Sequence, residues 1–369
     1  MSTPRPFGAQ ALGDSLSNAS STAWTAPASA AEVARAARQV DCRWLLALYA
    51  VIPLSLAIVA IDVLLLEQAW LNSYLPSSPT NWAFWTVVFG LPHIVASLLT
   101  MADREYVAHY RHSLTWPLLI FACISVLGLA GPQPVSYQLL FGFVAVYTAY
   151  HVLSQQLGLT LMMMNTAPSR VFKAWKWIAL AAGVAIYLAV VREVGFGKVW
   201  LGSIHLSMYL DEFMAYVAGA LSAILVVLGV HLHRQSRTRI GRWYMWANVA
   251  MLGSIFCVNE LGYTLFVVLI PRIIHDVTAF SVYITHDANR NRSEPRNAVY
   301  RAARFTRLPP IVLLPLLSIA IAYGLTINEH YAPAAFVIFT ITFLHYYFEG
   351  FIWRGPNPHR QNCSFRKEW

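Results

Sequence analysis

The sequence predicts an all-α, polytopic membrane protein with about ten transmembrane helices and both termini in the cytoplasm. Of its 369 residues, 57% are hydrophobic and only 12% are charged, which is too apolar for a soluble domain. The apolar residues form separate stretches near the length of about 20 residues that a transmembrane helix needs. Basic residues gather in every second connection between these stretches, a pattern typical of polytopic membrane proteins.

Ten apolar stretches follow one another from Arg43 onward. They are residues 44–66, 82–101, 114–130, 136–164, 175–191, 205–230, 243–258, 261–285, 309–325 and 331–353. We assign residues 41–354 to one transmembrane helical domain. Residues 1–40 are rich in Ser, Ala, Thr and Pro, so we expect a disordered cytoplasmic tail, with a transit peptide as the alternative. Residues 355–369 are expected to form a cytoplasmic C-terminal tail.

The charge of the connections predicts the orientation. The basic connections hold Arg104 and Arg111, then Arg170, Lys173 and Lys176, then Arg234 to Arg242, and then Arg290 to Arg307. The alternate connections hold almost no basic residues, so the positive-inside rule places both termini in the cytoplasm. We expect the bacterial inner membrane as the location. The net charge of +9 therefore arises from the connections between membrane spans. The basic runs lack the folded aromatic platform of a nucleic-acid-binding protein, so we do not expect nucleic-acid binding.

Several classes of site are excluded by the motifs that the sequence lacks. The four cysteines have no CxxC spacing, so they predict neither a disulfide framework nor a zinc ribbon. The sequence contains no GxSxG, no P-loop, no GxGxxG and no HExxH.

One apolar stretch, PRIIHDVTAFSVYITHDANRNR from Pro271 to Arg292, carries the dipeptide His-Asp twice. His275 and His286 are eleven residues apart, close to three whole helical turns, so they share one face of a helix. Their depths differ by about 16 Å. We therefore place His275 near the bilayer middle and His286 at the cytoplasmic rim, where it is either a proton gate or simply solvated.

Other stretches place histidines at the depth of His275. His93, His275 and His345 each lie nine to eleven residues before the cytoplasmic end of their stretch, which is about 15 Å. His151 lies somewhat deeper, and Gln155 lies at the shared level. Ionisable side chains are costly at membrane depth and by default indicate function. Four at one level predict a shared metal or cofactor site.

Polar residues four positions after three of these histidines support a metal site, because they share its helix face. The pairs are His93–Ser97, His151–Gln155 and His345–Glu349. Imidazole binds first-row metals, and a neighbouring carboxylate or amide completes or orients the shell. The predicted ligands are His93, His151, His275, His345 and Glu349, with Gln155, Asp276 and His286 as further cofactor-binding residues.

Simpler structural roles remain open for these residues. A single histidine in a span is often hydrogen-bonding glue between helices, and Glu349 is alternatively a partner for Arg272. Asp276 points about 100° away from His275, toward a neighbouring helix. His109 and His112 have HxxH spacing but lie in a connection, where they either bind metal or are solvated. His359 is expected to be peripheral.

Four stretches resemble the Brp/Blh-like family: FGLPHIVAS around His93, AYHVLSQQLG around His151, Pro271 to Asn291, and FLHYYFEGFIWR around His345. These bacterial β-carotene-cleaving dioxygenases are polytopic, and the histidines on their helices are taken to bind non-haem iron. The sequence departs from the family at Ile94 and Ser97, where the family commonly has Gly and Asp. The resemblance implies iron and oxygen chemistry more than a carotene substrate.

Three functions follow as hypotheses. The first is a membrane oxygenase with non-haem iron, which acts on a lipophilic substrate from the bilayer and uses either a separate electron donor or none. The second is a haem- or quinone-binding electron-transfer protein with histidine axial ligands. The third is a proton-coupled transporter or assembly factor with an ion relay through Arg272, Asp276 and Glu349. Copper is an alternative metal, to which Met162, Met163 and Met164 are also suited, although such methionines commonly fill gaps.

Overall fold

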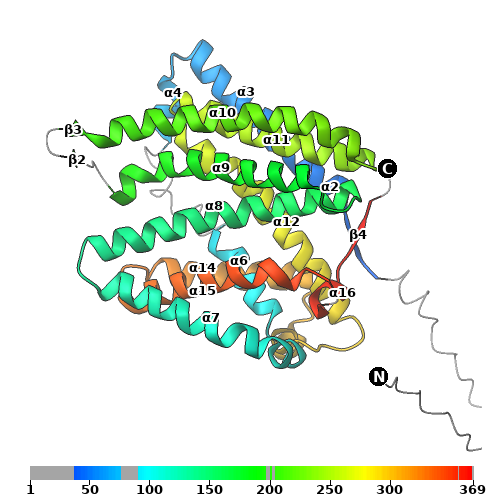
Figure 1. The fold of residues 1–369 in the computed structure, drawn as a ribbon. Helices are drawn as coiled ribbons and strands as arrows, with labels where there is room; N and C mark the ends of the chain where they lie inside the picture. Colours follow the sequence, from blue (N-terminus) through cyan, green and yellow to red (C-terminus); the bar gives the residue numbers. More distant parts are fainter. Residues whose placement is uncertain (1–36, 76–89, 197–199, 202–203, 356, 368–369) are drawn as a thin grey trace, which may run out of the picture. The chain divides into compact units, whose positions relative to one another are not determined.

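The computed structural model describes residues 37–75, 90–196, 200–201, 204–355 and 357–367; within residues 191–211 it describes secondary structure alone. The residues from Arg38 onward form one unit, shown in Figure 1. This unit is built from helices, with two short strand pairs, so the predicted all-α class is confirmed. Most of the predicted N-terminal tail lies outside the described residues.

The first half of the chain contains long helices joined by short connections. Its elements are β1 (Gln39–Asp41), α2 (Cys42–Ala47), η1 (Leu48–Ala50), α3 (Val51–Leu65), α4 (Ala69–Tyr74), α6 (Leu91–Thr100), α7 (Arg104–Ala130), α8 (Val135–Met164) and α9 (Arg170–Phe196). Asp103 begins α7, where its carboxylate accepts a hydrogen bond from the Glu105 amide.

The second half also consists mainly of helices and ends in a short strand. Its elements are β2 (Trp200–Leu201), β3 (Ile204–His205), α10 (Leu206–Gln235), α11 (Arg239–Glu260), α12 (Thr264–Arg290), α13 (Ala298–Ala302), η4 (Ala303–Thr306), α14 (Pro310–Thr326), α15 (Ala332–Ile352), α16 (Pro358–Gln361) and β4 (Ser364–Arg366).

Six described helices are long and apolar enough to cross a membrane. They are Cys42–Leu65, Arg104–Ala130, Arg170–Val190, Glu212–Gln235, Thr264–Arg290 and Ala332–Ile352. A seventh span results if Ala298–Thr306 and Pro310–Thr326, which meet at 106°, count as one broken span. Each of the ten predicted stretches contains a helix, but ten spans are not confirmed by length and hydropathy alone: α6 is a shorter apolar helix, and α8 and α11 are not among the candidate spans. Helices α8 and α11 carry polar residues such as Gln156 and Asn248, which are buried. These six helices are those of an integral membrane protein.

Four helices that are far apart in the sequence form a closed ring of contacts. Helix α12 packs against α6 and α8, and α15 packs against the same two helices. In Figure 1, α8 runs between α9 on one side and α14 and α15 on the other. The cyclic order α6, α12, α8, α15 surrounds the predicted histidines.

Helices α8 and α11 approach closely near Gly241. The Asn248 side chain donates to the Thr160 hydroxyl across 3.0 Å, and the Arg237 amide donates to the Met164 carbonyl across 3.1 Å. A Cβ at Gly241 would lie 2.4 Å from Cα of Met164, so only glycine fits this contact.

The two ends of the described chain are tied together. Strands β1 and β4 pair in parallel, with Gln39 opposite Ser364. Asn289, near the end of α12, donates to the carbonyl oxygens of Arg38 and Asn362, each across 2.9 Å. The segment after α15 is therefore folded against the helices.

Candidate metal centre

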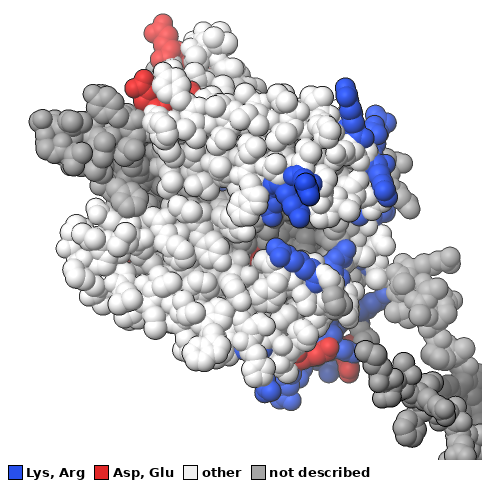
Figure 2. Space-filling view, in the orientation of Figure 1, with Lys and Arg blue, Asp and Glu red and all other residues white. Residues whose placement is uncertain are grey.

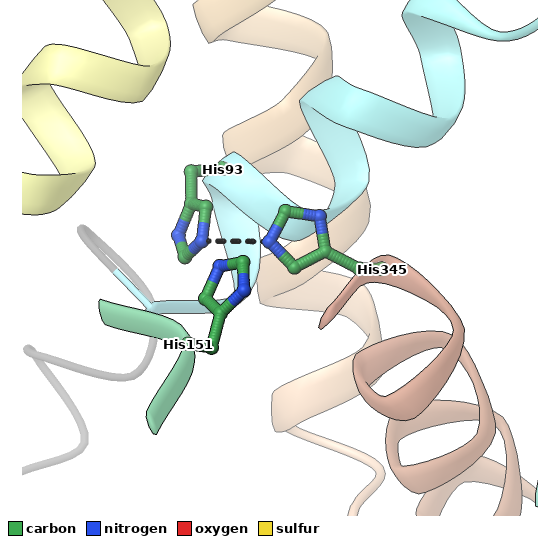
Figure 3. A group of neighbouring side chains, drawn as sticks. All are labelled: His93, His151 and His345. Atoms are coloured by element: carbon green, nitrogen blue, oxygen red, sulfur yellow. Dashed lines mark hydrogen bonds between the residues drawn. The ribbon is translucent and has the colours of Figure 1, made fainter. Parts of the chain in front are cut away.

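Four buried histidines from the ring of four helices face one another. Their exposed fractions are 2% for His93 of α6, 3% for His151 of α8, and 0% for both His275 of α12 and His345 of α15. Their ring centroids lie 4.9 to 5.0 Å apart around a closed circuit that follows the same order as the helices. Figure 3 shows three of these imidazoles, from His93, His151 and His345, turned toward one another.

The spacing of their nitrogens suits the ligand shell of a metal ion. Nε2 of His93 lies 3.1 Å from Nε2 of His345, the dashed line in Figure 3. Two nitrogens bound at about 2.1 Å and at right angles around one ion lie about 3.0 Å apart. Ligand atoms of His93, His151 and His345 lie within 4.8 Å of one another, and so do those of His93, His275 and Asp276. The two groups share His93, and each can hold a metal ion.

The serine of α6 determines which nitrogen of His345 carries a proton. Ser97 Oγ lies 2.6 Å from the Ile94 carbonyl oxygen, to which it donates its one proton. The same oxygen lies 2.7 Å from His345 Nδ1. Because the serine proton is already used, His345 Nδ1 carries a proton and donates it to Ser97. Nε2 of His345 is then left with a lone pair, as a metal ligand requires.

A carboxylate lies beside the ring of His93. Asp276 Oδ1 is 3.1 Å from His93 Nδ1, a charge contact that does not have the geometry of a hydrogen bond. The Nε2 atoms of His93 and His345 lie 3.1 Å apart, so they either share a proton in a hydrogen bond or bind one cation together. These buried histidines could hold a metal ion.

Glu349 is placed to complete the ligand set. Its Oε2 lies 3.3 Å from His151 Nε2 and 3.6 Å from His345 Nε2, so the carboxylate lies beside two of the buried imidazole nitrogens. Gln155 of α8 donates a hydrogen bond to this oxygen. Two residues predicted from their spacing to histidines thus contact each other across two helices.

Arg272 is paired within its own helix. Its Nε lies 3.3 Å from Asp276 Oδ2, so Arg272 is an ion-pair partner of Asp276 and not of Glu349. The guanidinium also packs against the backbone of Gly90, where a Cβ would lie 1.9 Å from one of its nitrogens. Asp276 is held between Arg272 and His93, which fits the prediction that it faces a neighbouring helix.

Several polar atoms of the site have no hydrogen-bond partner among the described residues. These atoms are Nε2 of His151, both ring nitrogens of His275, and Oδ1 of Asp276. Buried polar groups are nearly always hydrogen-bonded, so a cluster of unpaired donors and acceptors calls for a missing partner. Imidazole nitrogens and a carboxylate oxygen are suitable ligands for a first-row metal.

Comparison with models of known protein families, with curated proteins and with solved structures finds no match for this chain. The resemblance to the Brp/Blh-like family therefore stays a prediction.

His286 belongs to a different cluster at the end of α12. It is fully buried, so the expectation that it is solvated is wrong. Its Nε2 lies 2.8 Å from the Tyr106 hydroxyl, and its Nδ1 lies 2.8 Å from Asp287 Oδ1. The Tyr300 hydroxyl donates to the other oxygen of Asp287 across 2.8 Å. These partners occupy both ring nitrogens, and among the described residues the groups that could hold a metal do not include His286.

His359 of α16 stacks on His286, with ring centroids 5.0 Å apart. It is completely buried and not peripheral as expected, because the segment after α15 folds back onto the helices. Burial lowers the pKa of His359 to about 2, and the charge of Arg290 acts in the same direction.

At Asp103, burial alone would raise the pKa, but the hydrogen bond from Arg290 outweighs it and the pKa is lowered.

The HxxH pair on α7 does not form a metal group. His109 and His112 are exposed, and the guanidinium of Arg111 donates to His112 Nε2 across 3.2 Å. Among the residues that the structure describes, the possible metal groups contain neither histidine. Met163 and Met164 are buried in the apolar core, where they fill space.

The sequence analysis missed two features of the site. Spacing along α6 pairs Ser97 with His93, whereas the serine contacts His345 of another helix. A cavity also opens beside Gln155 and Glu349. Contacts and cavities between helices depend on how the helices pack, which the periodicity of a single stretch does not contain.

Proposed function

We propose that this chain is an integral-membrane, non-haem iron oxygenase, or a closely related oxidative enzyme, that acts on a lipophilic substrate. The observation that carries the proposal is the contact between Nε2 of His93 and Nε2 of His345, which lie 3.1 Å apart, the spacing of two nitrogens that bind one ion. The unpaired nitrogens of His151 and His275 support the same assignment.

The donor set favours iron among the first-row metals. Nitrogen ligands from histidines with one carboxylate are the ligands of non-haem iron oxygenases, in which the bound iron activates dioxygen. Here His93, His151, His275 and His345 would hold the ion and Glu349 would complete the shell. Gln155 orients Glu349, and Asp276 and Ser97 orient His93 and His345. The surrounding helices bury the four histidines.

The packing of the imidazoles favours an ion over a haem. Axial histidines of a haem stand on opposite faces of a wide planar ring. In this bundle each imidazole lies about 5 Å from two others, so the histidines leave no slot for such a ring between them. This geometry supports the oxygenase hypothesis over the haem hypothesis.

The ten predicted stretches, with both termini in the cytoplasm of a bacterial inner membrane, remain our proposed topology. It is supported by the alternation of basic and uncharged connections. In this topology the site lies near the bilayer middle, where an apolar substrate is concentrated. A soluble or membrane-bound electron donor would approach from the cytoplasm if the reaction needs one.

Elemental analysis and an optical spectrum of the purified protein test this function. We expect stoichiometric iron and no Soret band. Protein that holds no stoichiometric metal under metal-replete expression would contradict the proposal, and a Soret band would favour the haem hypothesis. Ion flux in proteoliposomes that depends on Asp276 and Glu349 but not on metal would instead support a transporter.

A further inference from the structure

A cavity of about 390 Å³ extends from Glu349, beside the candidate metal centre, to three basic residues. Gln155 and Glu349 line its inner part, and Lys176, Arg354 and Arg360 also line it. Glu349 lies in the last turn of α15 and Arg354 lies two residues beyond its end, so the cavity extends along the end of this helix. Its volume is at the lower end of the range for small-molecule pockets, about 300–1,000 Å³.

The basic residues of the cavity have no acidic partner. Within the described part of the chain, no carboxylate lies within 4.0 Å of a side-chain nitrogen of Lys176, Arg354 or Arg360. Arg360 is held by a hydrogen bond to the Cys363 carbonyl oxygen, and its guanidinium lies 5.3 Å from the centroid of the Phe365 ring. Figure 2 shows Lys and Arg side chains on both sides of a hollow in this face. Three unpaired cations around one opening attract an anion.

The walls between the cations and the metal centre are mainly apolar. They include Leu159 of α8, Ala279 and Val282 of α12, and Trp353 beyond α15. Such walls bind an aliphatic chain and not a second charge. The carboxyl group of Glu349 at the inner end would also repel an anion, so a charged head group is retained at the cations.

The same charges oppose a path for cations. A proton or metal ion that entered through this cavity would pass Lys176, Arg354 and Arg360, which have no carboxylate within 4.0 Å among the described residues. An anionic ligand gains binding free energy from each of these groups, through hydrogen bonds in which both the donor and the acceptor are charged.

From these features we infer that the cavity binds a single-chain amphiphile with a carboxylate or phosphate head group. The head group contacts Lys176, Arg354 and Arg360, and the chain extends past Leu159 and Ala279 toward Glu349 and the histidines. The assignment of this ligand as the substrate rests on the proposed function. With that assignment, the metal centre acts on a carbon a few bonds from the head group.

Equilibrium binding to the protein in nanodiscs of neutral lipid tests this inference without any turnover. We expect dodecyl phosphate and laurate to bind about tenfold or more tightly than dodecanol, since hydrogen bonds between charged groups are the strongest available. The K176Q/R354Q double variant should lose this preference. K173Q, which removes an exposed lysine of the same helix that does not line the cavity, should retain it.

A second variant fills the cavity in place of changing its charge. A Cβ at Gly158 of α8, which lines the cavity, would meet no heavy atom within 4 Å. G158F should therefore weaken binding of dodecyl phosphate and of dodecanol alike. Unchanged binding of both in G158F would show that the amphiphiles bind elsewhere and would overturn the inference.

Two further results would overturn the ligand class. Equal binding of dodecyl phosphate and dodecanol to the natural protein would show that the cations do not select an anion. Inorganic phosphate that binds as tightly as dodecyl phosphate would identify a soluble anion as the ligand. Metal content measured on the same samples separates the oxygenase proposal from the proposed amphiphile site. Missing metal would contradict the oxygenase, whereas the preference for an anionic head group is measured without metal.

Discussion

Ser97 determines the protonation of His345, because its own proton is donated to the Ile94 carbonyl oxygen. In the Ser97→Ala variant, His345 Nδ1 loses its acceptor, and the imidazole is free to rotate or to place its proton on Nε2. We expect the affinity for metal to fall about 10- to 100-fold, the usual effect of removing a group that orients a ligand. Metal competition with a chelator of known affinity measures this change.

Ser318→Ala provides the matched control for this variant. Ser318 of α14 is also fully buried and donates to a backbone carbonyl, that of Leu314, but it is not hydrogen-bonded to a histidine. Its replacement should leave metal affinity unchanged. Equal losses in both variants would mean that Ser97 acts through general packing and not through His345.

The lowered pKa of His359 predicts how the free energy of unfolding depends on pH. Its pKa is about 2 in the folded protein and 6.5 ordinarily, so the unfolded chain binds more protons between these values. The folded state therefore loses stability as pH falls below about 6.5, by about 1.4 kcal/mol per pH unit for this group. Between about pH 6.5 and pH 5 the expected loss is about 2 kcal/mol.

Thermal unfolding in nanodiscs across this range measures the loss. His359→Gln should make the unfolding temperature less dependent on pH, because glutamine does not titrate. His112→Gln, which removes an exposed histidine, should keep the dependence of the natural protein. A His359→Gln variant with unchanged pH dependence would assign the effect to other groups.

The contact between α8 and α11 depends on the missing side chain of Gly241. In Gly241→Ala the new Cβ would lie 2.4 Å from backbone Cα of Met164, so the two helices must separate. We expect the free energy of unfolding to fall by about 1–3 kcal/mol or more, the usual cost of overpacking. Thermal or denaturant unfolding in detergent measures the change.

Gly253 of the same helix is the control, since a Cβ there would meet no heavy atom within 4 Å. Gly253→Ala should be neutral or stabilising by about 0.5–1 kcal/mol, because alanine is the better helix former. Similar destabilisation by both substitutions would contradict a specific close approach at Gly241.

The helices themselves could largely be predicted from hydropathy, because each apolar stretch is long enough for its own helix. Polar residues such as Gln156 and Asn248 are buried between helices, and they make α8 and α11 less apolar than a usual span. The pairing of β1 with β4 could not be predicted, since it joins Gln39 to Ser364 across the whole chain.

For the whole molecule, counting depth along the predicted spans brought His93, His151, His275 and His345 to one level, and the bundle places them in contact. Depth alone did not predict that His286 is buried, because it does not reveal what packs around the end of α12. The proton positions on the imidazoles and the cavity beside Glu349 depend on lateral packing between helices. These features became visible only with the structure.

The most direct test of the central claim is the metal content of the His93→Ala/His275→Ala double variant. Among the described residues, each group that could hold a metal contains His93, and one also contains His275. We therefore predict that stoichiometric metal is lost while the protein remains folded in nanodiscs. A His109→Ala/His112→Ala double variant, which removes exposed histidines of α7, should keep the metal of the natural protein. Full retention of metal after loss of His93 and His275 would contradict a metal centre built by the four buried histidines.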